Sequence, residues 1–135
     1  MLIKYLKTRL SGYIPVCSRS NTNIVIDARV PGEISTPEFP DGFRDGSCTW
    51  KIQAPENLRL EITIKDLKLT GVDDYLIIRD GAEAISPLIG KYGPCASGSL
   101  TLFSSGHLVF LQMVSSVFTV NDELRIAFKP TDPGK

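Results

Sequence analysis

The stretch 47–66 constrains the fold of this chain more than any other part of the sequence. Its first half alternates apolar and polar side chains from Cys48 to Ala54, and its second half does the same from Leu58 to Lys65. A period of two is typical of strands that bury one face, whereas a helix would scatter the same side chains around its axis. Because the intervening residues 55–57 include proline and asparagine, the stretch predicts two half-buried strands joined by a short turn.

Similar patterns predict strands on both sides of this stretch, and no segment shows a helical period. The further predicted strands are 24–30, 75–78, 88–92, 100–103, 107–114 and 124–129. Prolines and glycines break 31–42 so often that only short edge strands or turns are expected there, and Pro130 and Pro133 are expected to end the last strand. The pattern favours an all-β jelly-roll sandwich of two stacked antiparallel sheets, with a closed barrel as the alternative. Trp50, the only tryptophan, is expected between the sheets.

Length and charge limit the classes of function. A chain of 135 residues fits one domain, and we expect an extended or mobile lead-in over 1–23, the sandwich over 24–130 and a tail over 131–135. The 15 basic and 15 acidic residues cancel, so no broad field favours nucleic acid or an anionic membrane. Apolar residues are spread along the chain, which disfavours insertion into a membrane.

The cellular compartment stays open at this level. Basic residues interrupt the apolar character of 1–10, so no signal peptide is recognised, and the chain is a mature fragment, a chain with a mispredicted start or a cytosolic protein. The cysteines are Cys17, Cys48 and Cys95. Under export, three cysteines give one disulfide and an odd thiol, and otherwise they are three buried thiols.

Catalytic motifs are absent from the sequence. His107 is the only histidine, and neither a G-x-S-x-G elbow nor a Cys–His pairing accompanies it. Zinc-binding and nucleotide-binding patterns do not occur either. We therefore expect a protein that is not an enzyme and has no such cofactor, and a hydrolase hypothesis would have to rest on His107.

Several short motifs occur in a fixed order between residues 32 and 110. They are GEISTPEFP at 32–40, CTWKIQAP at 48–55, DYLIIRDG at 74–81, LIGKY at 88–92 and SGHLVF at 105–110. In this order they resemble the CUB domain family of extracellular modules, with Thr36 and Phe39 in place of the usual serine and tyrosine. The resemblance covers residues 24–129 and implies a two-sheet jelly-roll sandwich.

The resemblance also implies a disulfide pattern, in which the first cysteine pairs with the second and the third with the fourth. Cys48 takes the second place and Cys17 is the candidate for the first, which implies a Cys17–Cys48 disulfide. Gly71 occupies the third place, so Cys95, near the fourth place, has no partner of this kind. Cys95 is then a buried thiol or one that joins another chain.

A subset of the family binds calcium through acidic residues in loops at one end of the sandwich. By resemblance Asp45 and Asp74 take two of these places, whereas Ser116 stands where the third acid belongs. Calcium takes six to eight oxygen ligands, so the loss of one carboxylate disfavours the site. The segment 121–123, which includes Asp122, follows in the same loop and would have to compensate. The alternative interpretation of Asp74 is a solvated turn.

The resemblance implies a non-catalytic extracellular module that recognises a protein or glycoprotein ligand, as part of a larger secreted or cell-surface protein. The predicted ligand-binding residues are Asp45, Asp74 and Tyr75, because loops at one end of a rigid sandwich carry recognition. One alternative is a single-domain secreted binder of carbohydrate or glycoprotein, similar to spermadhesins. A structural module that links chains through Cys95 is the other.

Overall fold

Nine strands form the described part of the chain, and no residue in that part is helical. The computed structural model describes residues 23–35, 44–69, 74–93, 98–117 and 123–133. The strands are β1 (Asn23–Asp27), β2 (Gly32–Ser35), β3 (Arg44–Gln53), β4 (Arg59–Lys68), β5 (Tyr75–Asp80), β6 (Leu88–Tyr92), β7 (Leu100–Phe103), β8 (Leu108–Val117) and β9 (Glu123–Thr131). The predicted all-β class is confirmed.

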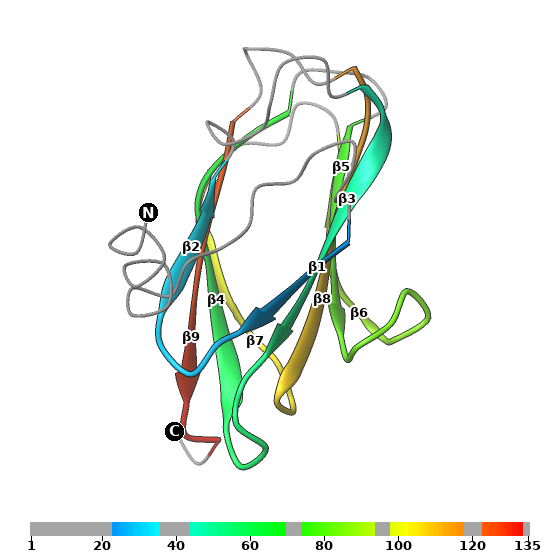
Figure 1. Cartoon of the computed structure of the whole chain (residues 1–135). Coiled ribbons are helices and arrows are strands. Elements are labelled where there is room, and N and C mark those ends of the chain that lie inside the picture. The colour runs from blue at the N-terminus through cyan, green and yellow to red at the C-terminus, as the bar shows by residue number, and fades with distance from the viewer. Residues whose placement is uncertain (1–22, 36–43, 70–73, 94–97, 118–122, 134–135) are drawn as a thin grey trace, which may run out of the picture.

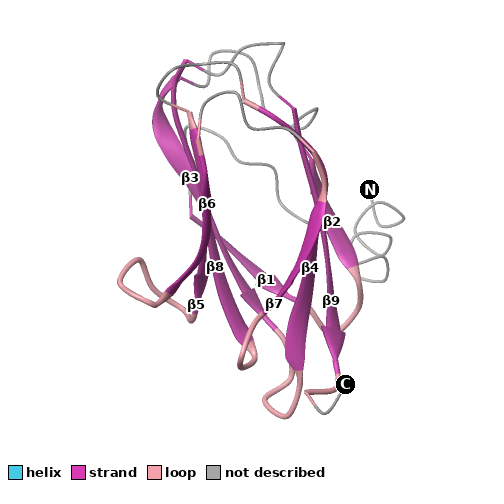
Figure 2. Cartoon of the chain, turned by 180° about the vertical axis from the view of Figure 1, so that it is seen from behind, coloured by secondary structure: helices cyan, strands magenta, loops and turns pink. Residues whose placement is uncertain are grey.

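Two sheets face each other across the core (Figure 1, Figure 2). One sheet has the order β1-β3-β8-β5-β6 and the other has the order β2-β9-β4-β7. The sandwich is therefore confirmed, and the closed-barrel alternative is wrong. All neighbouring strands are antiparallel except β1 and β3, which are parallel because the chain leaves the sheet to form β2 before it returns.

The stretch 47–66 links the two sheets. Its first predicted strand overlaps β3, which lies between β1 and β8, except for Ala54. Its second overlaps β4, which lies between β9 and β7, except for Leu58. The turn between them is closed by a hydrogen bond from the amide of Leu58 to the carbonyl of Pro55, at 2.9 Å. A single turn of the sequence thus passes the chain from one layer to the other.

The core lies between the inward faces of the two sheets. Trp50 is 2% exposed and belongs to one cluster with the other buried apolar side chains, which confirms its predicted place. The largest fully buried side chains include Trp50, Ile52, Leu60, Ile62, Ile64, Leu76, Ile78, Leu111, Met113, Leu124 and Ile126. They come from strands of both sheets, so the packing of these side chains holds the two sheets together.

A β-bulge divides the inward face of β4. The pairing with β9 shifts between Ile64 and Asp66, and the buried positions change from the even-numbered Ile62 and Ile64 to the odd-numbered Leu67 and Leu69. An extra residue on one strand turns the later side chains to the other face, and the shift keeps both leucines in the core.

The last strand does not end at Pro130, so that prediction is wrong. β9 continues to Thr131, and Pro130 pairs with Leu60 of β4. The backbone of Leu60 bonds to Ser104 instead of β9: its amide donates to Ser104 Oγ at 2.8 Å and its carbonyl accepts from the Ser104 amide at 3.0 Å. Pro130 therefore sits where no ladder bond requires an N–H, which is where a strand tolerates proline. The first strand is shorter than predicted and ends at Asp27.

The turn between β5 and β6 depends on Gly81. Its φ is +148°, and a Cβ built on it would lie 2.3 Å from Ser86 Oγ. We expect Gly81→Ala to lower the free energy of unfolding by about 1–3 kcal/mol, because it adds backbone strain and a clash. Urea denaturation measures the change, with Gly106→Ala as the matched control, since a Cβ at Gly106 meets nothing within 4 Å. Equal effects of the two variants would contradict this account of the turn.

Candidate functional site

Strand register gathers the predicted site residues at one end of the five-stranded sheet. The paired residues on either side of Asp45 in β3 place it opposite Ser116 of the adjacent strand β8. On the other side of β8, Tyr75 of β5 pairs with Val114, so Asp74 also reaches this end. Neighbouring strands lie about 4.8 Å apart, so the backbones at these positions lie close together at the same end of the sheet. This is the upper end of Figure 1, where β3 and β5 begin.

Asp74 lies inside the protein at this end. Its exposed fraction is 0%, although it directly precedes the half-buried Tyr75. The solvated-turn interpretation of Asp74 is therefore wrong. Asp74 makes a polar or electrostatic interaction within the chain, as a buried carboxylate requires. A fully buried carboxylate cannot touch a ligand directly, so direct contact with a ligand is not expected from Asp74.

Tyr75 provides an aromatic surface beside a cation. Its ring lies 4.8 Å from Nζ of Lys91 on β6, a cation–π distance. Gly93 allows the ring to pack closely, because a Cβ at that position would lie 3.1 Å from Tyr75 Cε1. Tyrosine is one of the residue types that contribute most strongly to protein interfaces.

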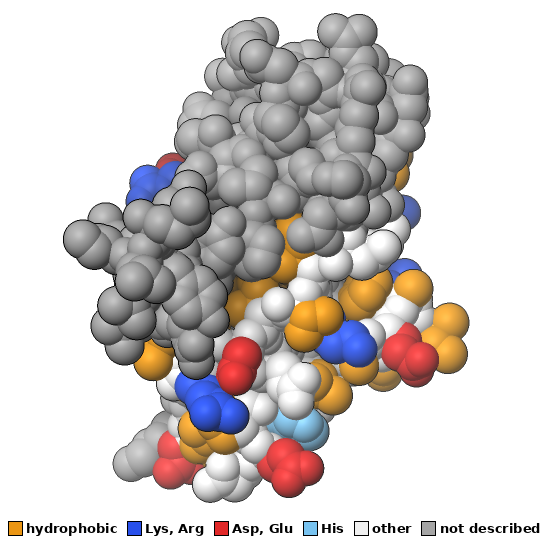
Figure 3. Space-filling model, viewed as in Figure 1, with side chains coloured by type: hydrophobic (Ala, Val, Ile, Leu, Met, Phe, Trp, Pro, Cys, Tyr) orange, Lys and Arg blue, Asp and Glu red, His pale blue; other side chains and the backbone are white. Residues whose placement is uncertain are grey.

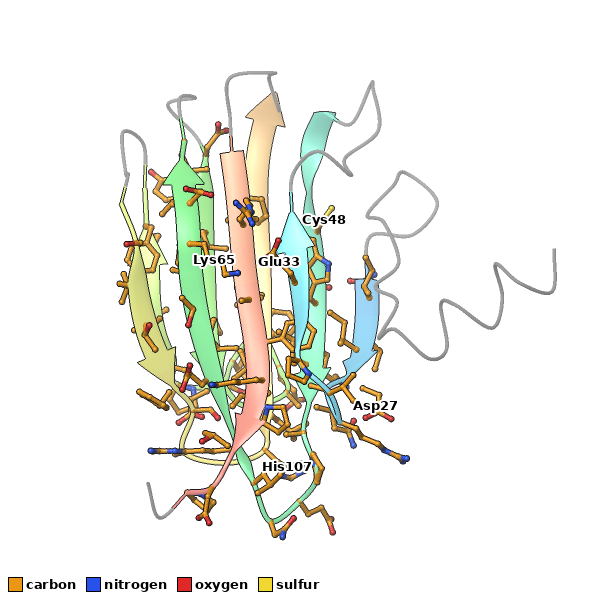
Figure 4. All side chains as sticks on the ribbon, turned by 90° about the vertical axis from the view of Figure 1, so that its left-hand side faces the viewer. Asp27, Glu33, Cys48, Lys65 and His107 are labelled. Carbon is orange, nitrogen blue, oxygen red and sulfur yellow. The ribbon has the colours of Figure 1, made fainter. Side chains whose placement is uncertain are left out.

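Cys48 is fully buried on β3, toward the same end of the sandwich (Figure 4). Its sulfur is disulfide-bonded. Cys17 and Cys95 both lie outside the described residues, so the Cys17–Cys48 pairing and the fate of Cys95 stay predictions.

The calcium candidates Asp45, Asp74 and Asp122 stay predictions. Asp122 lies outside the described residues, and Asp45 and Ser116 are described by their backbone alone. Within the described ranges, no three His, Cys, Asp or Glu side chains are grouped so that they could hold a metal ion. Two carboxylates and a neutral hydroxyl at the family positions fall short of the oxygen-rich, acidic set that calcium takes.

His107 lies at the other end of the sandwich, away from Cys48 (Figure 4). It is half-buried in the turn before β8, where its carbonyl accepts a hydrogen bond from the amide of Ala54 at 2.8 Å. In the part of the chain that the structure describes, no serine or cysteine side chain is hydrogen-bonded to its imidazole. Among the described residues, then, no nucleophile-activating pair surrounds His107.

A charged network on the outer face of the four-stranded sheet was not predicted. Glu33 of β2 pairs with Lys65 of β4 at 3.0 Å and with Arg125 of β9 at 3.3 Å, and Arg125 also pairs with Asp66 at 3.1 Å. Glu33 and Lys65 point toward one another across this face (Figure 4). The network depends on β9 lying between β2 and β4.

The hydrogen bond from Lys65, with help from Arg125, lowers the pKa of Glu33 below its ordinary value of 4.5. A lowered pKa means that the ionised form contributes stability above pH 4.5, and that this contribution is lost as the pH falls through the folded-state pKa. We expect Glu33→Gln to lower the free energy of unfolding at pH 7 by less than about 1 kcal/mol, because the pairs are exposed to solvent. Urea denaturation at several pH values should show the difference fade below pH 4.5, and a constant difference would contradict the ion-pair explanation.

The strand order defines a two-sheet β-sandwich of jelly-roll type. A family model described as CUB domain matches residues 22–128, so this chain belongs to the CUB domain family. The predicted resemblance is confirmed. No helix within the described ranges has the length and apolar character needed to cross a bilayer.

Individual relatives and structures agree with this assignment. The chain is 35% identical to bone morphogenetic protein 1 of Xenopus laevis over 66 residues, which are 45% of this chain and 9% of that protein. The full extracellular region of zebrafish Gpr126/Adgrg6 has a TM-score of 0.65 at 23% identity, with 83% of this chain and 15% of that chain covered. The MASP-1 CUB2 domain bound to Ca2+ has a TM-score of 0.58 at 19% identity, with 84% and 99% covered. The two structural matches show the fold alone, and the Xenopus match spans less than a tenth of its relative.

Proposed function

We propose that this chain is a non-catalytic extracellular module, part of a larger secreted or cell-surface protein, that recognises a protein or glycoprotein. Membership of the CUB domain family supports this proposal, as does the greater length of the Xenopus relative. The observation that carries it is the register that brings Asp45 and Tyr75 to one end of a rigid sandwich.

The proposed end combines an acidic residue, an aromatic ring and a cation. At the proposed end, Asp45 contributes an acidic residue at the start of β3, while Tyr75 and Lys91 contribute an aromatic ring and a cation. Asp74 is buried at this end and interacts within the chain. Rigid strands position such residues while the connecting loops stay free to vary between family members, which suits recognition of a particular partner.

Retention of partners from conditioned culture medium on the immobilised chain tests this proposal. We expect specific proteins, identified by mass spectrometry, to be retained by the unmodified chain and by Asp27→Lys, and lost with Asp45→Lys. Asp27 is the matched control because its exposed carboxylate lies at the other end of the sandwich (Figure 4). Equal retention by both variants would contradict the assigned end, and His107→Ala should leave retention unchanged.

Calcium should have little effect on this chain, because Ser116 replaces an acid of the family set. We expect the melting temperature to stay the same when calcium is added to about 10 mM, a concentration above the usual dissociation constants of extracellular calcium sites. The variant Ser116→Asp restores the missing carboxylate and should gain a calcium-dependent rise in melting temperature. A rise in the unmodified chain that disappears in Asp74→Asn would show instead that the site is functional.

A further inference from the structure

Strand β1 is an edge strand whose outer backbone groups have no partner among the described residues. The amide of Ala28 donates to the carbonyl of Gln53 at 2.8 Å, so the even-numbered residues of this segment direct their backbone toward β3. Because direction alternates along a strand, the N–H and C=O groups of Asn23, Val25 and Asp27 point away from the sheet. The outermost position of β1, in blue, is visible in Figure 4.

The other edges carry features that commonly block strand addition. β2 and β7 each have only four residues, and the pairing of β6 with β5 contains a register shift at Ile78 and Arg79. Short strands and irregular pairings are the usual protection of sheet edges. β1 is regular over its five residues, and its central side chain, Val25, is 65% exposed. Hydrophobic side chains also reach the surface around β1 and β3 (Figure 3).

We propose that β1 pairs antiparallel with β1 of a second copy of this chain, about a two-fold axis at Val25. In this register Val25 lies opposite Val25 of the second copy, and Asn23 lies opposite Asp27 in both directions. Every outward-facing residue of β1 then exchanges both of its backbone hydrogen bonds, and two five-stranded sheets become one continuous sheet. The segment that binds to the β1 edge is therefore β1 of a second copy, whose length, direction and side chains match it.

Side-chain chemistry selects this register over its neighbours. A two-fold axis at Asp27 would place two carboxylates directly opposite each other, which is destabilising. A two-fold axis at Ile26 would pair Val25 with Asp27 and leave Asn23 beyond the end of the opposite strand. The axis at Val25 places two exposed valines together and keeps the charges apart. A formal net charge of zero also means that two copies do not repel each other strongly.

Sedimentation velocity of the intact chain, with its disulfide left oxidised, tests this pairing. We expect the dimer fraction to rise as protein is concentrated from about 10 μM to about 1 mM, the range suited to a small interface. Val25→Lys places two ammonium groups on the axis and should leave a monomer throughout, at least a tenfold weakening. The matched control Ile85→Lys, at a position that is 87% exposed and away from β1, should dimerise like the unmodified chain.

Amide hydrogen exchange identifies the edge independently of any substitution. We expect the amides of Val25 and Asp27 to exchange fast in dilute protein and slowly in concentrated protein, whereas those of Ile24 and Ile26, which face β3, should be slow in both. A monomer at all concentrations, a dimer that survives Val25→Lys, or outward amides that exchange fast in concentrated protein would each overturn the proposal. Partner retention at the Asp45 end is measured separately, so the failure of one proposal does not decide the other.

Discussion

Replacing Trp50 with alanine is expected to lower the free energy of unfolding by about 3–5 kcal/mol, a large fraction of the stability of a domain of this size. The indole is 2% exposed and belongs to the cluster to which both sheets contribute. Its removal takes away buried apolar area and leaves a cavity that the rigid sheets can fill only in part. Urea denaturation followed by circular dichroism measures the loss.

A matched control separates burial from simple loss of a large side chain. Ile85 is 87% exposed, so Ile85→Ala should change the free energy of unfolding by no more than about 0.5 kcal/mol. A loss below about 1 kcal/mol for Trp50→Ala would mean that the ring is not between the sheets, and the arrangement of the two layers would have to be revised.

Reversing the charge of Asp74 is expected to cost about 3–5 kcal/mol of stability, because it leaves an uncompensated charge in a buried site. The carboxylate is 0% exposed and interacts within the chain, and an ammonium group cannot take over as an acceptor. Thermal unfolding of Asp74→Lys should therefore show a much lower melting temperature.

The same substitution at Asp27, whose side chain is 65% exposed, is the control and should be nearly neutral. If Asp74→Lys were as stable as Asp27→Lys, Asp74 would have to be a surface residue after all. The expected instability also bears on function, since loss of binding in an Asp74 charge reversal would report unfolding. Asp45 is the residue that tests recognition.

Much of the fold follows from alternation in the sequence. Strands β6 and β7 have the predicted bounds, and the inward positions of 48–54 and 124–128 are the buried ones, because a strand with one wet face must alternate. These patterns do not predict which strands pair with each other or in which direction. The parallel pairing of β1 with β3 depends on where the chain returns after β2, and the tolerance of Pro130 depends on the Leu60 backbone bonding to Ser104.

The candidate site was only partly predictable for the same reason. The motif that contains Asp74 and Tyr75 indicates the start of a strand after a turn, but it does not show that the carboxylate of Asp74 is buried. The closeness of Asp45 and Ser116 comes from the register between β3 and β8, which the sequence does not encode locally. The network around Glu33 likewise joins three strands that are distant along the chain.

Site-specific photo-crosslinking tests most directly whether the Asp45 end recognises a partner. A photoreactive amino acid at position 45, and the same amino acid at position 27 in a second variant, would be activated in conditioned medium. Each variant must first show the melting temperature of the unmodified chain. We expect discrete heteromeric products from position 45 and none from position 27. Heteromeric products from position 27 alone, or from neither position, would contradict recognition through this end of the sandwich.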